Sequence, residues 1–380
     1  MDFNFSEEQQ SIVDAAERVF ADLCDDDTIK NIGESDVPLH KELWAQLADS
    51  GMLGLVVDEE HGGLGMTLVE LCLLFELQGK YLAPVPMIAT LVECGLVISG
   101  SDNVTLKADL LPQVVSGELL LSPVRASNGV LDTAGLAAAG NDDLVLNGVS
   151  GVVPYASVAG GYVVTATEDD GHAVIVYCPQ GASGLSVTEQ RMSSGELAGK
   201  LHFENCAVPA AQVVARGASA AALAERQKQD TFVALAALQV GVLDEGLRRT
   251  AEYVSQRKQF GRPLGAFQAV SQQAANAYMA IESLRGAYWR ALDDIEHGND
   301  AALSTRVAKF WVGEAGHKAA HTILHLHGGI GQDVDYPAHR YFLWGKHNER
   351  YIGTPDDMAL DVGKLIAADA TRVLNAGTAA

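Results

Sequence analysis

The stretch RKQFGRPLGAFQ, residues 257–268, decides the fold of the C-terminal half, because it separates two long helical patterns. The first pattern covers about 230–256 and the second about 267–297. Gly261 can adopt a positive φ angle and Pro263 cannot continue a helix, so the chain must turn between them. The sequence therefore predicts two long helices joined by a turn.

The turn carries three cations, Arg257, Lys258 and Arg262, although the formal net charge of the chain is −23. One explanation is an anion site, because Arg257 offers a bidentate fork and the turn offers backbone amides to a phosphate or pyrophosphate. The other is a helix C-terminus whose dipole attracts basic residues. The residues alone leave both explanations open.

Composition restricts the class of protein. A chain of 380 residues with 48% hydrophobic and 20% charged residues is typical of soluble globular proteins with two or three domains. We expect no membrane span, because no apolar run is long enough for one. We expect no signal peptide, because the N-terminus lacks a basic start followed by an apolar run. The acidic balance argues against nucleic-acid and membrane partners. Five scattered cysteines without a CxxC pair indicate reduced thiols in the cytoplasm.

Changes in residue pattern along the chain predict an α+β protein with three domains. Residues 1–118 carry helical patterns. Residues 119–215 carry short β-branched runs between Gly, Asn and Asp pairs, which predicts a small antiparallel β domain. Residues 222–380 predict an antiparallel bundle of about four helices, which the small residues 217–222 link to the β domain. The predicted strands cover 144–146, 152–153, 162–166, 173–177 and 200–203, and the turn signals include Asn147-Gly148 and Asp169-Asp170-Gly171.

Two local patterns near the N-terminus predict helix starts and turns. Ser6-x-x-Gln9 has the spacing of a capping box. Gly62-Gly63-x-Gly65 is not flanked by a strand and a helix at the spacing of a dinucleotide fingerprint. We therefore expect a turn there that lets two backbone segments pack closely.

The stretch 257–268 resembles the flavin-contacting turn of acyl-CoA dehydrogenases, Arg-x-x-Phe-Gly-x-x-(Leu/Ile)-x-x-(Phe/His)-Gln. The resemblance runs over nearly the whole chain and implies FAD as cofactor and α,β-dehydrogenation of an acyl-CoA thioester. In that family the turn reaches across a subunit interface to the adenosine pyrophosphate of FAD held mainly by the neighbour. The FAD contacts that it implies here are Arg257, Gln259, Phe260, Leu264 and Gln268.

A second stretch, 324–331, resembles the family's Gln-x-x-Gly-Gly-x-Gly turn, which also serves the neighbour's FAD. His325 stands where the family usually has Gln. The resemblance implies further FAD contacts from His325, Leu326, Gly328 and Gly329, and from Thr354 in a C-terminal loop.

The chain departs from the family at the catalytic base. A carboxylate must remove the proton α to the thioester while a hydride leaves to the flavin. Its two family positions hold Ile352 and Thr231 here. The Asp-x-x-Arg pair that the family uses near the acyl-CoA maps to Gln229 and Phe232.

Two nearby acids, Glu349 and Asp230, are the candidates for a displaced base. Each could serve only if the local register shifted, because neighbouring residues of a helix point about 100° apart. In the β domain, the segments that grip the flavin ring in the family align with 122–126 and with Val152-Val153-Pro154. These segments lack the family's aromatic side chain and hydroxyl donor.

The positions at which this sequence departs from the family are those that contact flavin and substrate within one chain. The positions that contact a partner's FAD match the family pattern. This pattern resembles the base-lacking subunits of actinobacterial heteromeric enzymes of steroid side-chain β-oxidation. We therefore expect a second acyl-CoA dehydrogenase-family subunit as partner, in a heterodimer or an α2β2 heterotetramer. The alternatives are a self-sufficient homo-oligomer that uses Glu349 or Asp230 as base, and a flavin-free interaction protein on the same fold.

A rival chemistry rests on Glu314-x-x-His317, which is a di-iron signature when it lies on a bundle helix. His321 continues the same face. A di-iron site needs a second such motif, and only Asp294-x-x-His297, at a helix end, comes near it. We expect no metal, and a polar stripe of Glu314, His317 and His321 instead.

Overall fold

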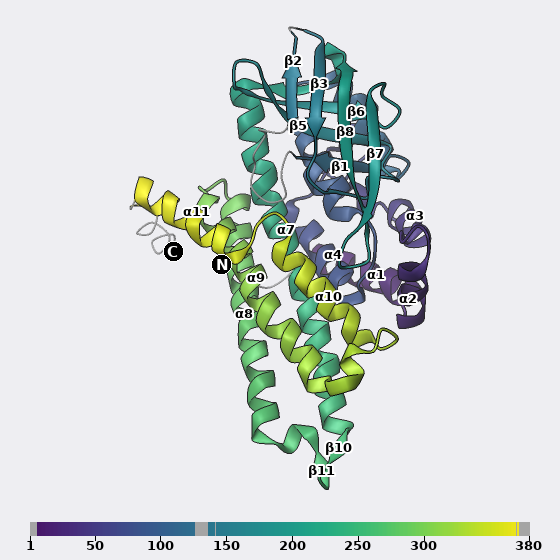
Figure 1. Ribbon diagram of the computed structural model, residues 1–380, viewed down its shortest axis with the longest axis vertical. Coiled ribbons are helices and arrows are strands. Elements are labelled where there is room, and N and C mark those ends of the chain that lie inside the picture. Colours follow the sequence, from purple (N-terminus) through teal and green to yellow (C-terminus); the bar gives the residue numbers. More distant parts are fainter. Residues whose placement is uncertain (1–5, 126–135, 141, 370, 372–380) are drawn as a thin grey trace. The chain divides into compact units, whose positions relative to one another are not determined.

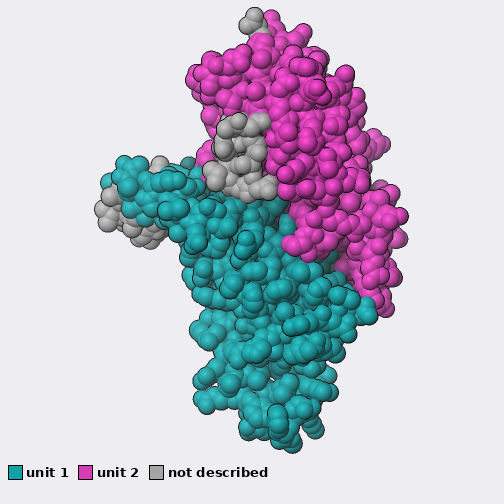
Figure 2. All heavy atoms as spheres, viewed as in Figure 1, with its two compact units in different colours: residues 1–4, 75–82, 232–380 teal, residues 5–74, 83–231 magenta. Residues whose placement is uncertain are grey.

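The computed structural model describes residues 6–125, 136–140, 142–369 and 371 (Figure 1). The described residues form two compact units, coloured separately in Figure 2. One unit comprises 75–82 and 232–369, and the other lies within 6–74 and 83–231. None of the helices in these described stretches is long and apolar enough to cross a membrane.

The N-terminal part of the chain is helical, as the sequence predicts. Its elements are α1 (Glu7–Leu23), α2 (Asp26–Glu34), α3 (Lys41–Asp49), α4 (Leu68–Tyr81), the π-helix η3 (Ile88–Gly95), α5 (Leu96–Ser99) and α6 (Val104–Val115). The capping box at the start of α1 is confirmed. The Gln9 backbone N–H donates to the Ser6 hydroxyl at 3.1 Å, and the Ser6 backbone N–H donates to the Gln9 side-chain oxygen at 3.0 Å.

The glycine-rich turn before α4 packs two backbone segments closely, which confirms that prediction. A Cβ atom on Gly63 would lie 2.0 Å from the carbonyl oxygen of Val57. Gly62 and Gly65 have φ angles of 85° and 60°, which are unfavourable for residues with a side chain. Only glycine therefore fits this turn without a shift of the backbone.

The middle of the chain forms a sheet of nine strands within the described residues. The strands are β1 (Leu121–Val124), β2 (Leu136–Ala139), β3 (Leu144–Val149), β4 (Val153–Pro154), β5 (Gly161–Glu168), β6 (Ala173–Pro179), β7 (Leu185–Arg191), β8 (Leu197–Val208) and β9 (Val213–Arg216). The main path is β4-β8-β3-β2-β5-β6-β9, with β1 paired to β5 and β7 paired to β8. Most strand pairs are antiparallel, as the sequence predicts, but β1 and β2 both run parallel to β5.

One predicted turn in this sheet is wrong and another is confirmed. Asn147-Gly148 lies inside β3, where the register with β8 shifts between Leu146 and Gly148. A glycine with φ of 129° here forms an irregularity within the strand rather than its end. Asp169-Asp170-Gly171 does turn the chain, since the backbone N–H of Glu168 donates to the carbonyl of His172 at 2.8 Å. A third polar cluster, Asn141-Asp142-Asp143, precedes β3 in the sequence, and its Asn141 lies outside the described residues.

The small residues 217–222 do not form a link. They are the first residues of α7 (Gly217–Gln256), a helix of 40 residues. Alanine has the highest helix propensity of all residues, so four alanines in this segment favour a helix over a flexible connection.

The unit of 75–82 and 232–369 is a helical bundle. Its helices are the second part of α7, α8 (Gln268–Glu296), α9 (Ala302–His327), α10 (Pro337–Arg350) and α11 (Pro355–Ala368). Figure 1 shows α8, α9 and α10 side by side, and α9 packs against both neighbours and α11. The buried Gln239 amide of α7 donates to the carbonyls of Val312 and Gly345 at 3.2 and 3.1 Å. The predicted bundle and the α+β fold class are therefore confirmed.

Candidate functional site

The stretch that separates α7 from α8 is a β-hairpin at one end of the bundle (Figure 1). Its strands are β10 (Lys258–Gln259) and β11 (Arg262–Pro263). Phe260 and Gly261 connect them with φ angles of 53° and 80°. Positive φ at both central residues is the requirement of a type I′ turn, which suits the twist of a hairpin. The sequence predicted the turn and not the hairpin, because Phe-Gly is not one of the usual type I′ pairs.

The hairpin presents its side chains to solvent. Phe260 is 90% exposed, in a backbone conformation that is costly for an aromatic residue. The Arg262 guanidinium lies 4.0 Å from the centre of the Phe267 ring, in a cation–π contact. Arg257, Gln259 and Gln268 are also exposed, and Leu264 is half-buried. Four of the five predicted FAD contacts in this stretch can therefore reach a partner.

The second predicted stretch lies at the same end of the bundle. The Tyr253 ring, close before the hairpin, stacks on the His327 ring with centroids 4.6 Å apart. The short helix η6 (Gly328–Gln332) follows at once. Gly328 has a φ of 66°, and Gly328 and Gly329 are exposed, whereas Leu326 is buried. Stacking thus holds the two predicted turns together, although they are far apart in the sequence.

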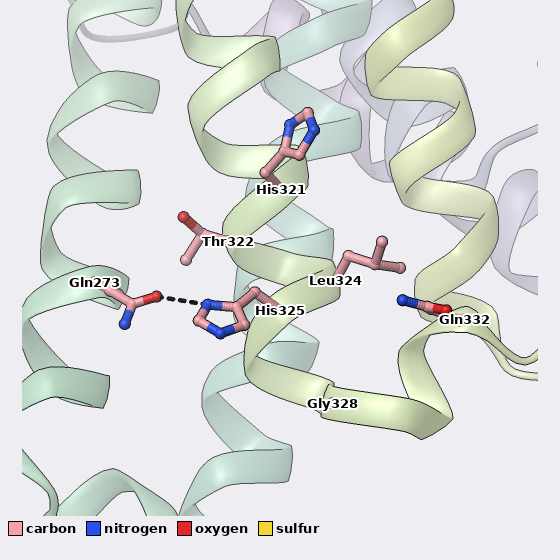
Figure 3. A pocket seen from close by; sticks show the side chains of 7 residues that line it. All are labelled: Gln273, His321, Thr322, Leu324, His325, Gly328 and Gln332. Carbon is pink, nitrogen blue, oxygen red and sulfur yellow. Dashed lines mark hydrogen bonds between the residues drawn. The ribbon is translucent and has the colours of Figure 1, made fainter.

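A pocket of about 500 Å³ opens beside this second turn (Figure 3). The imidazole Nδ1 of His325 lies 2.9 Å from the side-chain oxygen of Gln273 on α8. Figure 3 shows Leu324 pointing to the opposite side, toward Gln332. The sequence indicated only two lining residues, His325 and Gly328. The full lining is Gln273, His321, Thr322, Leu324, His325, Gly328 and Gln332.

Neither of the two positions that the resemblance assigns to the catalytic base holds an acid. Thr231 is buried, and its hydroxyl donates to the Gln227 carbonyl at 2.6 Å. Ile352 is 6% exposed and packs in one cluster with Phe232 and Met358. Its φ of 55° is a strained value for a β-branched residue. Phe232 itself stands at the position of the family's substrate-contacting Arg. The two replacements that the sequence showed separately are therefore in one cluster, with Phe310 and Tyr351 packed against it.

The two candidates for a displaced base are held by cations elsewhere. The Glu349 carboxylate is buried, accepts from the Lys346 ammonium, and lies 3.6 Å from Nδ1 of His317. Neither of these partners belongs to the Ile352 cluster. The Asp230 carboxylate, in the other unit, accepts from Nε of Arg226 at 2.7 and 2.9 Å. Both acids are thus engaged in ion pairs, and a role for either of them as the base stays a prediction.

A buried lysine holds the loop that carries Ile352. The Lys309 ammonium of α9 is fully buried and donates to the carbonyls of Asn348, Glu349 and Gly353 at 3.4, 3.1 and 2.8 Å. The first two carbonyls belong to the last turn of α10, where a helix lacks internal donors and attracts cations. Burial lowers the pKa of Lys309 to about 7, although the Glu349 carboxylate opposes the shift. No sequence signal marked this residue.

Thr354, the remaining predicted FAD contact, caps α11. Its hydroxyl accepts from the backbone N–H of Asp357 at 3.3 Å and donates to the Asp357 carboxylate at 2.7 Å. The backbone N–H of Thr354 also donates to this carboxylate, which lowers the pKa of Asp357. The Thr354 side chain therefore has a structural role in the loop, and a flavin contact from it stays a prediction.

The β-domain segments aligned with the family's flavin-ring contacts bind within their own unit. The Ser122 hydroxyl of β1 donates to the carbonyl of Pro154 in β4 at 2.6 Å. The Arg125 guanidinium pairs with the Glu93 carboxylate of η3, which is fully buried. Ala126 lies outside the described residues.

The di-iron alternative has no support in the described part of the chain, which contains no group of three or more His, Cys, Asp or Glu side chains placed to hold a metal. Glu314 pairs with Lys318 at 3.1 Å instead. His317 and His321 lie against each other with ring centroids 4.5 Å apart, so a polar stripe is present on α9.

Comparison with known proteins identifies the family of the chain. Residues 6–118 match the family "Acyl-CoA dehydrogenase, N-terminal domain", and residues 229–366 match "Acyl-CoA dehydrogenase, C-terminal domain". The chain belongs to the acyl-CoA dehydrogenase family, whose members are FAD-dependent oxidoreductases.

The chain has relatives both among known sequences and among solved structures. Acyl-CoA dehydrogenase FadE27 of Mycobacterium tuberculosis is 32% identical over 97% of this chain and 99% of its own length. The Tcur3481–Tcur3483 steroid ACAD structure matches at 36% identity and a TM-score of 0.89, over 96% of this chain and 99% of the matched one. The ChsE4–ChsE5 complex of Mycobacterium tuberculosis matches at 31% identity and a TM-score of 0.91, over 97% and 99%.

Proposed function

We propose that this chain is one of two unlike subunits of an FAD-dependent acyl-CoA dehydrogenase, and that it completes the FAD site of its partner. The packing of Ile352 against Phe232 carries the proposal. The place of the base and the place of the substrate-binding Arg are filled by two apolar, buried side chains. A site without a carboxylate cannot remove the proton α to a thioester.

The β domain also supports the proposal that the partner, and not this chain, binds the flavin ring. Ser122 and Pro154 bind each other through a hydroxyl and a carbonyl, and Arg125 is engaged by a buried carboxylate. A flavin ring bound here would have to break contacts between buried groups, and each unsatisfied group would cost about 1–3 kcal/mol. These residues do not fit an isoalloxazine ring bound within the chain.

The hairpin and η6 do fit the other half of the cofactor. Arg257 offers an exposed guanidinium for a pyrophosphate, and Phe260 offers a ring that is 90% exposed. The pocket at His325 adds amide and imidazole groups that can bind an adenosine. When bound, FAD accepts the hydride from the β carbon of the acyl group. In this proposal the partner supplies the base, and this chain binds and orients the cofactor.

The substrate class is proposed from the relatives. The matched Tcur3481–Tcur3483 structure is described as a steroid ACAD and, like the ChsE4–ChsE5 complex, combines two components. A steroid whose side chain is activated as a CoA thioester is therefore the substrate we propose for the assembled enzyme.

The test is the visible absorbance of the chain purified alone, and again after co-expression with an acyl-CoA dehydrogenase-family subunit encoded beside it. We expect a colourless chain alone and a yellow complex with one FAD for each pair of chains. Arg257→Ala should weaken FAD binding by the complex about tenfold or more, since a charge-assisted hydrogen bond is lost. Lys364→Ala, which removes an exposed cation from α11, is the matched control. A yellow chain that bleaches alone with an acyl-CoA would contradict the proposal.

A further inference from the structure

Gln273 of α8 fixes the tautomer of His325, a residue that lines the pocket beside η6. The side-chain oxygen of Gln273 can only accept a hydrogen bond, and it lies 2.9 Å from Nδ1 of His325, so Nδ1 carries the proton. A neutral imidazole has one N–H group, so its second nitrogen, Nε2, is an acceptor. Figure 3 shows the two side chains directed toward each other from α8 and α9. A contact within the chain therefore presents one acceptor nitrogen at the pocket.

The pocket around His325 is polar but uncharged. Its lining contains no Asp, Glu, Lys or Arg. These residue types are also missing from 264–281, which includes the first turns of α8, and from the residues of η6. The volume of about 500 Å³ is in the range of small-molecule sites. A neutral ligand that donates a hydrogen bond suits such a pocket better than a phosphate, which binds best beside cations.

Two other imidazoles lie within four residues of His325 on α9, and both are engaged elsewhere. Nδ1 of His321 lies 2.7 Å from the carbonyl oxygen of His317, and Figure 3 shows the His321 ring pointing away from His325. Nδ1 of His327 lies 2.8 Å from the carbonyl oxygen of Ile323, and its ring is buried. Among these three imidazoles, His325 is the one placed to meet a ligand in the pocket.

We infer that Gln273 is a positioning residue, and that Nε2 of His325 accepts a hydrogen bond from a hydroxyl or amino group in the adenosine half of FAD. The inference rests on the proposed function. It makes cofactor binding pH-dependent, because an imidazole changes its charge between pH 5 and pH 8 and has N–H groups on both nitrogens once it is protonated. Nε2 then opposes the adenosine donor with a second donor. The Gln that the family usually has at this position cannot titrate, so the pH dependence is particular to a chain with His325.

The test measures the dissociation constant of FAD from the co-expressed complex by flavin fluorescence between pH 8 and pH 5.5, with the mass of the complex checked at each pH. Wild type should bind FAD about tenfold more weakly at pH 5.5, because one hydrogen bond is lost. His325→Gln should remove this change, since an amide donates and accepts at both pH values. His321→Gln, in the same pocket lining, is the matched control and should keep it.

A second variant tests the role of Gln273 itself. Gln273→Glu has nearly the same shape, and it places a carboxylate beside Nδ1 of His325. An opposite charge at this distance stabilises the protonated imidazole, so the midpoint of the weakening should move up by about one pH unit. A residue that only fills space would leave this midpoint where it is.

Four results would overturn the inference. They are an FAD affinity that does not change with pH, an affinity that rises on acidification, a tenfold change that His325→Gln retains, and an unmoved midpoint in Gln273→Glu. A rise on acidification would mean that the protonated imidazole binds the pyrophosphate. Failure of the proposed function is distinguishable, because the complex would then lack FAD or its FAD affinity would not respond to Arg257→Ala. Arg257-dependent FAD binding without the pH effect refutes this inference alone.

Discussion

Replacing Lys309 with Met should change how the stability of the chain depends on pH. The ammonium is fully buried, and burial lowers its pKa from 10.5 to about 7 in the folded chain. The unfolded chain keeps the ordinary value. Between the two values the unfolded state binds more protons, so this group makes the folded state more stable as pH rises and less stable as pH falls toward 7. Methionine cannot titrate and has no such effect.

The magnitude follows from the size of the shift. A shift of one unit corresponds to about 1.4 kcal/mol, so the whole shift from 10.5 to about 7 corresponds to about 5 kcal/mol. Between pH 7 and pH 9, where the folded group loses its remaining protons and the unfolded group keeps most of its own, the contribution is about 2 kcal/mol. Wild type should therefore gain about 2 kcal/mol over Lys309→Met across this range.

The assay is guanidinium unfolding of both proteins at several pH values, read as the difference between their unfolding free energies. Other titrating groups cancel in this difference. Lys309→Met also loses three hydrogen bonds to carbonyls, but that loss does not depend on pH and only displaces the curve. Lys318→Met, on the exposed side of the same helix, is the control and should give a flat difference. A flat difference for Lys309→Met would refute the reasoning and show that the three carbonyls keep the ammonium charged.

Three further predictions concern the replaced catalytic site and the glycine turn. Ile352→Glu should lower the unfolding free energy by about 3 kcal/mol in denaturant titrations, because it would place a carboxylate in the buried apolar cluster with Phe232 and Met358, and the chain alone should gain no dehydrogenase activity; Ile352→Val is the conservative control. Glu349→Gln and Asp230→Asn, combined in the co-expressed enzyme, should leave its kcat unchanged, and a large loss of kcat would show that one of these acids is the base. Gly63→Ala should destabilise the chain by about 2 kcal/mol in thermal or chemical unfolding, because its Cβ would lie 2.0 Å from the Val57 carbonyl oxygen; an unchanged midpoint would show that this turn can move.

Local patterns in the sequence were sufficient to predict the structure where short-range interactions determine it. Ser6 and Gln9 form their capping box because both hydrogen bonds lie within one helical turn. The predicted core segments of β3, β5, β6 and β8 are all strands, since alternating β-branched residues need the two faces of a sheet. Local patterns could not predict the strand directions, because the parallel pairing of β1 with β5 depends on contacts between segments that are distant in the sequence.

Several local signals had more than one structural outcome. A glycine with positive φ serves a turn and a strand irregularity equally well, so Asn147-Gly148 could not be assigned without the register of β8. A run of small residues is either a link or a helix, and α7 became a helix of 40 residues. The hairpin at Phe260-Gly261 required positive φ at a phenylalanine, which propensities alone disfavour.

The candidate site was also only partly predictable from the sequence. Individual motif positions, such as Arg257 and Ile352, were visible in the sequence, but their surroundings were not. That Phe232 packs with Ile352 follows from the folding of α7 against the loop after α10. That Lys309 holds this loop was invisible, because a lysine in a helical pattern is normally a solvent-exposed residue.

The loop from 349 to 354 is fixed by interactions that do not involve the Ile352 side chain. Ile352 has a φ of 55°, which is a strained value for a β-branched residue. The backbone is held on both sides of this residue, because the Lys309 ammonium of α9 binds the carbonyls of Glu349 and Gly353, and Thr354 caps α11. These contacts are independent of the side chain at 352, so the loop does not need a carboxylate there to keep its conformation. The proposed function, in which the partner supplies the base, is therefore compatible with a chain that retains its fold and its hairpin and η6 surfaces.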